Sequence, residues 1–156
     1  MRLQKIVSGG QTGVDRAALD VALDHDVPVG GWCPKGRRAE DGPIPSRYPL
    51  QETPSEAYKQ RTAWNVRDSD GTLILTDGTL AGGTARTLQE AERQGKPVLH
   101  VRTTDPVPIP MIRAWGEDHD IRTLNVAGPR ASEADGIYDR AYVLCSELLA
   151  AVLEKS

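Results

Sequence analysis

The chain has 156 residues and a formal net charge of −3 at pH 7. This length is expected to form one domain, residues 1–156, with a core of its own. No apolar run approaches the roughly 20 residues that a membrane span requires, and the acidic balance argues against a general affinity for a nucleic acid polymer. Because the N-terminal residues also lack the apolar core of a signal peptide, we expect the protein to be cytoplasmic and not to associate with a membrane.

Strand and helix patterns alternate along the chain. Runs rich in Val, Ile, Leu and Thr predict five strands, at residues 3–7, 27–32, 72–76, 97–101 and 121–126. The first helix is predicted to start after Thr12, which forms a capping-box pattern with Asp15, and its apolar positions follow the spacing of one buried face. Further helices are expected at residues 55–68, 84–94, 109–118 and 137–152.

This alternation predicts an α/β fold. Strand–helix–strand units make right-handed crossovers, which give a mostly parallel five-stranded sheet with helices on both faces, a three-layer sandwich. We expect the strand order 2-1-3-4-5. The segment from Pro34 to Pro54 is rich in Pro, Gly and charge, and an irregular segment of this length is expected to close over a ligand or to pack against a neighbouring subunit.

Two glycine-rich loops are expected at the edge where the strands end, which is where open parallel sheets bind ligands. After the first strand, "SGGQTG" supplies Gly9, Gly10 and Gly13, which permit close backbone approach at a helix start, where free N–H groups attract an anion. The "AGGT" stretch repeats this device from Gly82 to Thr84. Neither loop has the dinucleotide fingerprint or the GKS/GKT of a P-loop, so the pattern indicates a phosphate or another oxyanion unless the glycines only make tight turns.

Basic side chains follow the same strands. Lys35 and Arg38 come after the second strand. After the fifth strand, "AGPR" combines Gly128 with Arg130, whose planar guanidinium suits bidentate contact with an oxyanion. The simpler interpretation is that each of these cations is only a solvated surface charge. Because all of them follow strands and so lie at the same edge of the sheet, however, they predict a cationic lining for one small anionic ligand.

The predicted second helix carries two pairs of polar residues. Arg61 and Asn65 are four residues apart and share a face, and Tyr58 and Thr62 form the neighbouring pair. An arginine on a helix is most often only a solvated charge, so Arg61 becomes a candidate through the family comparison below.

No catalytic or metal-binding pattern stands out. The three histidines lack metal-type spacing, the two cysteines lie far apart without a CxxC pattern, and no GxSxG motif occurs. We therefore expect no catalytic residue and no metal ligand.

Taken together, the motifs resemble those of the molybdenum carrier family, and the chain is similar to the molybdenum-cofactor carrier protein of algae. The resemblance covers most of the chain, through "SGGQTGVDRAALD", "GGWCPKGRRAEDGPIP", "YPLQET", "YKQRTAWNVRDSDGTLI", "LAGGT" and "NVAGPR". It implies a Rossmann-like homo-oligomer, a dimer or tetramer, that binds molybdenum cofactor (molybdopterin) or molybdate without a reaction. Molybdoenzymes are the implied recipients.

A wider resemblance reaches the lysine-decarboxylase-like proteins, which include nucleoside-monophosphate phosphoribohydrolases. Arg61 and Thr62 stand where that family has an Arg-Lys pair, and Gly83 and Thr84 match the GT of its PGGxGTxxE motif. Thr87 replaces its glutamate, which removes the carboxylate that would stabilise an oxocarbenium ion or activate water. A hydrolase-like enzyme and a nucleotide-sensing module stay as alternatives to a carrier.

The motifs and the resemblance define one expected ligand-binding set. Its members are Gly9, Gly10, Gln11, Thr12, Gly13, Lys35, Arg38, Arg61, Asn65, Gly82, Gly83, Thr84, Gly128 and Arg130.

Overall fold

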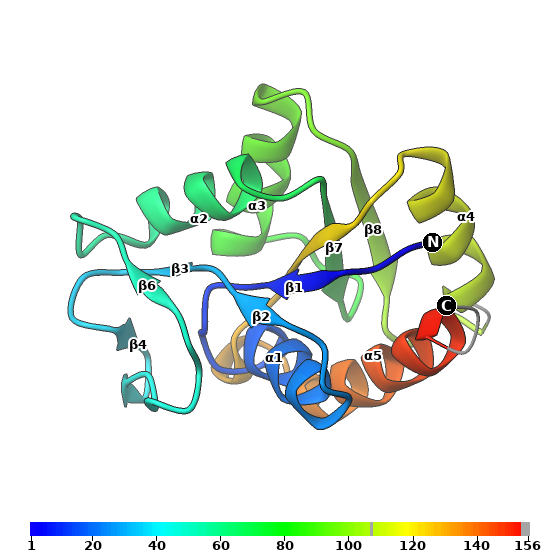
Figure 1. Cartoon of the computed structure of the whole chain (residues 1–156). Helices are drawn as coiled ribbons and strands as arrows, with labels where there is room; N and C mark the ends of the chain where they lie inside the picture. The colour runs from blue at the N-terminus through cyan, green and yellow to red at the C-terminus, as the bar shows by residue number, and fades with distance from the viewer. Residues whose placement is uncertain (107, 154–156) are drawn as a thin grey trace.

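The structure is a computed structural model that describes residues 1–106 and 108–153. Its centre is a parallel five-stranded sheet with the order β2-β1-β9-β7-β8 (Figure 1). The strands are β1 (Lys5–Val7), β2 (Val29–Gly30), β7 (Gly71–Thr76), β8 (Val98–Arg102) and β9 (Thr123–Ala127). The predicted α/β class and the parallel sheet are confirmed.

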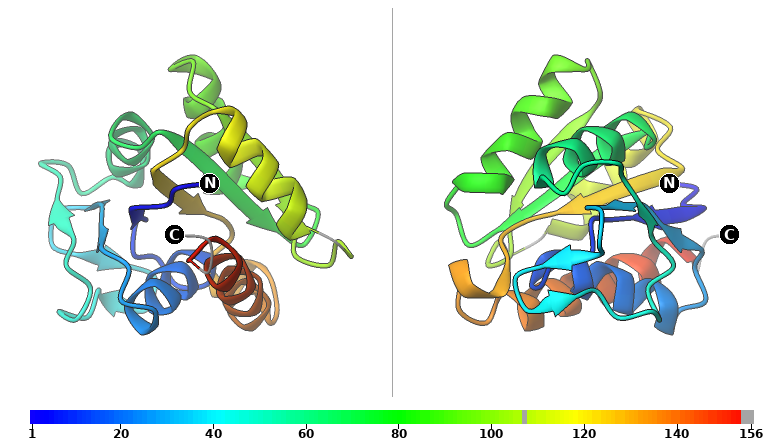
Figure 2. Two further views of the ribbon diagram at one scale, coloured as in Figure 1. Left: turned by 45° about the vertical axis from the view of Figure 1, so that its right-hand side comes forward. Right: turned by 90° about the vertical axis from the view of Figure 1, so that its left-hand side faces the viewer.

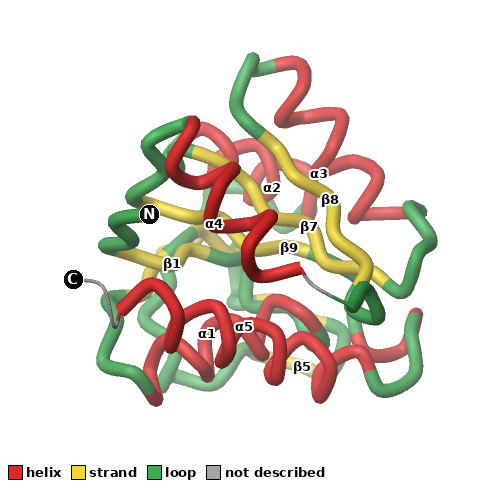
Figure 3. Tube along the Cα trace, turned by 90° about the vertical axis from the view of Figure 1, so that its right-hand side faces the viewer, coloured by secondary structure: helices red, strands yellow, loops and turns green. Residues whose placement is uncertain are grey.

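Helices cover both faces of the sheet. The helices α1 (Val14–Asp24), α4 (Pro108–Asp118) and α5 (Ile137–Leu153) share one apolar core on one face, and α2 (Tyr58–Arg67) and α3 (Gly82–Arg93) lie on the other (Figures 1 and 3). A short 3₁₀ helix, η1 (Ala131–Glu133), follows β9. Among the described residues, no helix is both long and apolar enough to cross a membrane.

The two faces of the sheet differ in polarity. Alternate residues such as Ile6, Leu73 and Leu124 are buried in the large core with α1 and α5. The opposite face, under α2 and α3, includes buried Thr72 and Asn125, and the Asn125 Nδ2 donates to Thr72 Oγ1 at 3.2 Å. Because successive strand residues point to opposite faces, one face supplies most of the apolar core and the other supplies polar groups near the strand ends.

The strand order differs from the expected 2-1-3-4-5. The last strand, β9, lies between β1 and β7 and pairs with both of them, so the order in chain terms is 2-1-5-3-4. Our expectation placed strands that are consecutive in sequence side by side, which is only the commoner arrangement. The apolar Leu124 and Val126 of β9 are fully buried, as a central strand requires.

The predicted strand at residues 27–32 is divided into two. Gly31 has a φ of +128°, and a Cβ there would lie 2.3 Å from the Ser8 carbonyl oxygen, so the chain turns at this point. Beyond the turn, β3 (Trp32–Cys33) leaves the main sheet and pairs in parallel with β6 (Gln51–Glu52).

The segment from Pro34 to Pro54 is folded rather than irregular throughout. It contains an antiparallel hairpin of β4 (Arg38–Ala39) and β5 (Gly42–Pro43), which stands beside α1 (Figure 2). A second, smaller core joins this segment to α1; it consists of Leu19, Cys33, Ala39, Ile44, Tyr48 and Leu50. We call residues 34–54 the hairpin segment.

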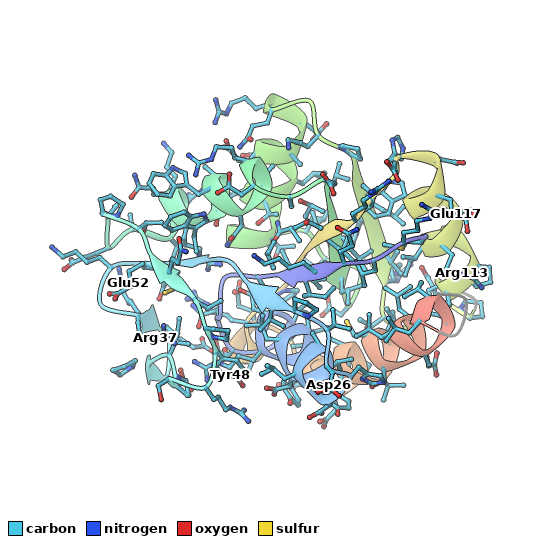
Figure 4. All side chains as sticks on the ribbon, in the orientation of Figure 1. Asp26, Arg37, Tyr48, Glu52, Arg113 and Glu117 are labelled. Atoms are coloured by element: carbon cyan, nitrogen blue, oxygen red, sulfur yellow. The ribbon has the colours of Figure 1, made fainter. Side chains whose placement is uncertain are left out.

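One arginine organises the hairpin segment from inside. The Arg37 guanidinium donates to four backbone carbonyls of the segment, those of Ile44 (3.0 Å), Pro45 (2.8 Å), Tyr48 (2.8 Å) and Leu50 (3.3 Å) (Figure 4). Arg37 lies between Lys35 and Arg38 in the sequence, and its guanidinium holds the backbone of the hairpin segment together.

Helix boundaries agree with the sequence within a few residues, but the start of the first helix is not capped as predicted. The helix α1 begins at Val14, with Gly13 as its N-cap and no side-chain cap. The predicted capping box is therefore wrong: the Thr12 hydroxyl donates to Glu40 at 2.6 Å, and the Asp15 carboxylate accepts the N–H of Gln11 at 3.2 Å. Thr12 thus connects the first loop to the hairpin segment, and Asp15 holds the loop that precedes its own helix.

Candidate functional site

A cavity of about 160 Å³ lies at the carboxyl ends of β1, β7 and β9. It is bounded by the loop after each of these strands and by one side of α2. The residues that line it are Gln11, Asp15, Tyr58, Arg61, Thr62, Gly82, Gly83, Thr84, Arg86, Thr87, Ala127, Gly128, Arg130 and Glu133. This is the edge at which open parallel sheets bind ligands, so the cavity is the candidate site.

A buried ion pair forms the floor of the cavity. Asp15 is 3% exposed, and its Oδ2 lies 3.3 Å from the Arg61 Nη1. Desolvation by burial raises the pKa of Asp15, while the guanidinium of Arg61 opposes this shift. The Arg61 Nε is also buried, and it has no hydrogen-bond partner among the described residues. One donor at the floor is therefore unsatisfied without a ligand or water.

The position of Arg61 depends on Gly9. A Cβ added at Gly9 would lie 1.7 Å from the Arg61 Nη1 and 3.1 Å from the Asp15 Oδ2. The first glycine of "SGGQTG" thus leaves room for a guanidinium of the protein itself, which then reaches the buried carboxylate.

The other glycines of the first loop pack against the protein. A Cβ at Gly10 would clash with the side chains of Leu50 and Ile44 in the hairpin segment, at 2.6 and 2.9 Å. A Cβ at Gly13 would lie 2.4 Å from the carbonyl oxygen of Pro129. These glycines allow close approach, as expected, but the group that approaches is another part of the chain.

The loop at the start of α3 is different, because its glycines face the cavity. Gly83 has no atom within 4 Å of the position of an added Cβ, and its backbone is not left-handed. Gly82, Gly83 and the buried Thr84 all line the cavity. A helix N-terminus carries partial positive charge, so this open side of the cavity suits an anion.

Two of the three arginines that line the cavity are paired with carboxylates. Arg61 pairs with Asp15, and the Arg130 Nε lies 3.0 Å from the Glu133 carboxylate and 3.5 Å from that of Glu40. Arg130 was predicted as a binding residue, and the structure places it on the cavity wall with two acidic neighbours.

The predicted residues divide into three groups. The structure brings seven of them to the cavity: Gln11, Arg61, Gly82, Gly83, Thr84, Gly128 and Arg130. Gly9 and Asn65 line a smaller gap of about 10 Å³ that shares Asp15, Arg61 and Thr62 with it. Gly10, Thr12, Gly13, Lys35 and Arg38 are absent from the lining of both spaces.

Three of the predicted residues have other contacts in the protein. The Asn65 amide accepts from the Trp32 backbone N–H (2.8 Å) and donates to the Trp32 carbonyl (3.0 Å), which joins α2 to β3. Arg38 stacks over the ring of Tyr58 and donates to the carbonyl of Glu56 at 3.3 Å. The backbone N–H of Lys35 donates to the Ser55 carbonyl at 3.0 Å.

Several lining residues were not predicted. The sequence pattern predicts Asp15 as part of a helix cap, and it carries no signal that marks Arg86 or Glu133 as binding residues. Tyr58 and Thr62 carried a usable signal, since they lie on the helix one turn from Arg61 and Asn65. Within residues 1–106 and 108–153, no cluster of three His, Cys, Asp or Glu side chains is arranged to hold a metal ion.

The sheet, the loops at its carboxyl edge and the lined cavity define a Rossmann-like α/β domain with one candidate ligand site. The model of the circularly permutated YpsA SLOG family matches residues 6–149. The chain belongs to this family.

Comparison with a solved structure extends the likeness over nearly the whole chain. A protein of Syntrophus aciditrophicus SB, named "Putative molybdenum carrier protein", is 48% identical, with a TM-score of 0.88 over 97% of this chain and 95% of that one. The predicted resemblance to the molybdenum carrier family is thereby confirmed.

A curated relative matches only in part. The 4-hydroxy-3-methylbut-2-enyl diphosphate reductase of Oleidesulfovibrio alaskensis is 31% identical over 70 residues, which are 44% of this chain. The matched residues span 25% of the reductase, about a quarter of its length.

Proposed function

We propose that this protein is a carrier that binds a small anionic ligand, bearing a phosphate or another oxyanion, without reacting it. The observation that carries the proposal is the open side of the cavity at α3, where Gly82 and Gly83 leave the backbone accessible beside arginine side chains. The unsatisfied Arg61 Nε at the floor supports it, because a buried N–H without a partner is costly unless a ligand or water accepts from it.

Molybdenum cofactor, in the form of molybdopterin, or molybdate is the proposed ligand. Support comes from the name of the similar protein of Syntrophus aciditrophicus. The cavity volume of about 160 Å³ also supports a small ligand, since pockets that enclose drug-sized molecules have about 300–1,000 Å³. In this proposal a ligand larger than the cavity extends in part beyond its mouth.

The carrier proposal also covers the proteins that receive the ligand, the cellular location and the oligomeric state. We propose transfer of the ligand to molybdoenzymes in the cytoplasm, and a dimer or tetramer as the working form. Light scattering of the purified protein tests the oligomeric state.

Gly83→Ala tests the ligand site. A Cβ at Gly83 meets no atom of the protein, so the variant should fold with an unfolding free energy unchanged or raised by up to about 1 kcal/mol. The methyl group would occupy the space that the ligand needs, and we expect affinity for molybdate, phosphate or adenosine monophosphate to fall about tenfold or more. Isothermal titration calorimetry and thermal unfolding measure the two effects.

Gly36→Ala is the control, because it adds the same methyl group to open space that does not line the cavity. Gly36 has a φ of +83°, so this variant should be slightly less stable and yet bind normally. Wild-type affinity in Gly83→Ala would place the ligand elsewhere, and no binding of any probe by the wild type would overturn the proposal.

One observation favours hydrolysis as a second candidate function. Thr87 stands where the phosphoribohydrolases have a glutamate, but the cavity that Thr87 lines also contains the buried carboxylate of Asp15. Incubation with nucleoside monophosphates distinguishes the two functions: free base released at an enzymatic rate by the wild type, and not by Asp15→Asn, would favour the hydrolase over the carrier.

A further inference from the structure

The charges in the cavity are not equally available to a ligand. Three guanidinium groups line it, those of Arg61, Arg86 and Arg130, together with two carboxylates, those of Asp15 and Glu133. Which arginine meets an incoming anion depends on which of them is already neutralised.

Arg61 is neutralised at the floor. Its side chain is 14% exposed, and its Nη1 lies 3.3 Å from the carboxylate of Asp15, which is itself buried. Removing either partner of such a pair would leave a buried charge alone, so Arg61 and Asp15 act together as a nearly neutral, hydrogen-bonding floor.

Arg130 is neutralised at the wall. Its Nε lies within ion-pair distance of both Glu133 and Glu40, at 3.0 and 3.5 Å, although this buried Nε forms no hydrogen bond among the described residues. An anion that approached Arg130 would therefore also approach two carboxylates, and the repulsion offsets much of the attraction.

Arg86 has no such partner. It lies in the first turns of α3, two residues after Thr84, and it lines the cavity at the exposed rim next to Gly82 and Gly83. Among the described residues it forms no ion pair and no hydrogen bond through its side chain. Its charge adds to the partial positive charge of the helix N-terminus.

We propose that Arg86 is the cation that pairs with the anionic group of the ligand, and that the ligand enters with this group at the rim and an uncharged polar part toward the floor. The inference rests on the proposed function of the same cavity. It names a ligand class: molecules with a single phosphate or similar oxyanion, because one uncompensated arginine and one helix terminus would not balance a di- or triphosphate.

The floor supports this orientation. Beside the ion pair of Asp15 and Arg61, the cavity is lined by buried Gln11 and Thr62, whose amide and hydroxyl groups are neutral hydrogen-bonding partners. A ligand with its charge at the floor would instead face the carboxylate of Asp15.

Arg86→Ala tests the proposal, with Arg93→Ala as the matched control. Both variants remove one positive charge from α3, but Arg93 lies near the far end of the helix, about 10 Å along its axis, and pairs with Glu90. We expect Arg86→Ala to weaken binding of molybdate, phosphate and adenosine monophosphate about 10- to 100-fold, and Arg93→Ala to leave it unchanged. Isothermal titration calorimetry at low and high salt measures the effect.

Salt separates a direct charge contact from a structural effect. Because Arg86 is exposed, its contribution should shrink as added salt screens it, so the affinities of the wild type and Arg86→Ala should converge at about 1 M salt. Adenosine triphosphate should bind no tighter than the monophosphate to the wild type.

The outcomes distinguish this inference from the proposed function. Equal losses in Arg86→Ala and Arg93→Ala, or an intact affinity in Arg86→Ala with a large loss in Arg130→Ala, would overturn the role of Arg86 and leave the anion-binding cavity standing. Tighter binding of the triphosphate would overturn the single-phosphate class. A wild type that binds none of the probes would overturn the proposed function itself.

Discussion

At the scale of single residues, the glycines of the two loops show how one residue type serves opposite purposes. Gly9 has no side chain because the Arg61 guanidinium occupies that space, whereas Gly83 has open space beside it. Gly9 lies between a strand and a helix and Gly83 lies in the first turn of a helix, and the sequence predicted a turn at both places. It did not predict what fills the space beside each glycine, because that depends on chain segments that come together only in the fold.

Gly9→Ala is the prediction that follows from this contrast. The added methyl group would displace the Arg61 guanidinium from Asp15 and leave a buried carboxylate with fewer hydrogen bonds. We expect the free energy of unfolding to fall by about 1–3 kcal/mol, measured by urea denaturation at pH 7. Gly83→Ala, which adds the same group to open space, should show no such loss. Equal stabilities of wild type and Gly9→Ala would mean that Arg61 does not need its present position.

At the scale of elements, the hairpin segment was the least predictable part of the chain. The helices followed from apolar residues at helical spacing, such as Val14, Ala18 and Val21 in α1, which local sequence encodes. Residues 34–54 have no such period. Their order comes from Arg37, whose four acceptors are up to 13 positions away, and from a small core shared with Leu19 of α1.

Arg37→Ala is expected to loosen this element selectively. Four backbone carbonyls would lose their donor, and we expect a loss on the order of 3 kcal/mol in the local stability of residues 37–50. Hydrogen exchange read by mass spectrometry should show faster exchange there and unchanged protection in β7 and β9.

The neighbouring Arg38→Ala is the control for this element. Arg38 donates to one carbonyl and stacks on Tyr58 at the surface, so its removal should leave exchange in the hairpin segment nearly unchanged. Uniformly faster exchange over the whole sheet in Arg37→Ala would contradict the selective role.

At the scale of the whole molecule, the sequence predicted which loops gather at the sheet edge but not the neighbours of each strand. The position of the loops follows from parallel strands, whose carboxyl ends share one edge whatever their order. The order itself depends on long-range pairing, and β9 pairs with β1 over a separation of more than 100 residues. This insertion is what brings Gly128 and Arg130 against Gly13 and α3, and so completes the cavity.

The same long-range assembly makes Glu40 a junction of three segments. Its carboxylate, in the hairpin segment, accepts from the Thr12 hydroxyl (2.6 Å) and from the Ser132 hydroxyl (2.5 Å) and backbone N–H (3.2 Å), and lies 3.5 Å from the Arg130 Nε. Desolvation tends to raise the pKa of Glu40, but the hydrogen bonds from Ser132 and Thr12 outweigh it and hold the pKa below its usual value.

Glu40→Gln tests this junction through the pH dependence of stability. A carboxylate whose pKa is lowered by folding stabilises the protein at pH values above its unfolded pKa of about 4.3, and this contribution is lost as the pH falls through the folded pKa. We expect the wild type to be more stable than the variant at pH 7, by about 1 kcal/mol or less because the group is near the surface, and the two to converge below about pH 4. Thermal unfolding from pH 3 to pH 8 measures the difference. Glu56→Gln is the control, because it removes a charge from just beyond the same segment at a side chain with no ion-pair partner among the described residues, and it should leave the stability at pH 7 nearly unchanged. A stability gap between wild type and Glu40→Gln that stays constant down to pH 3 would mean that the charge of Glu40 does not hold the three segments together.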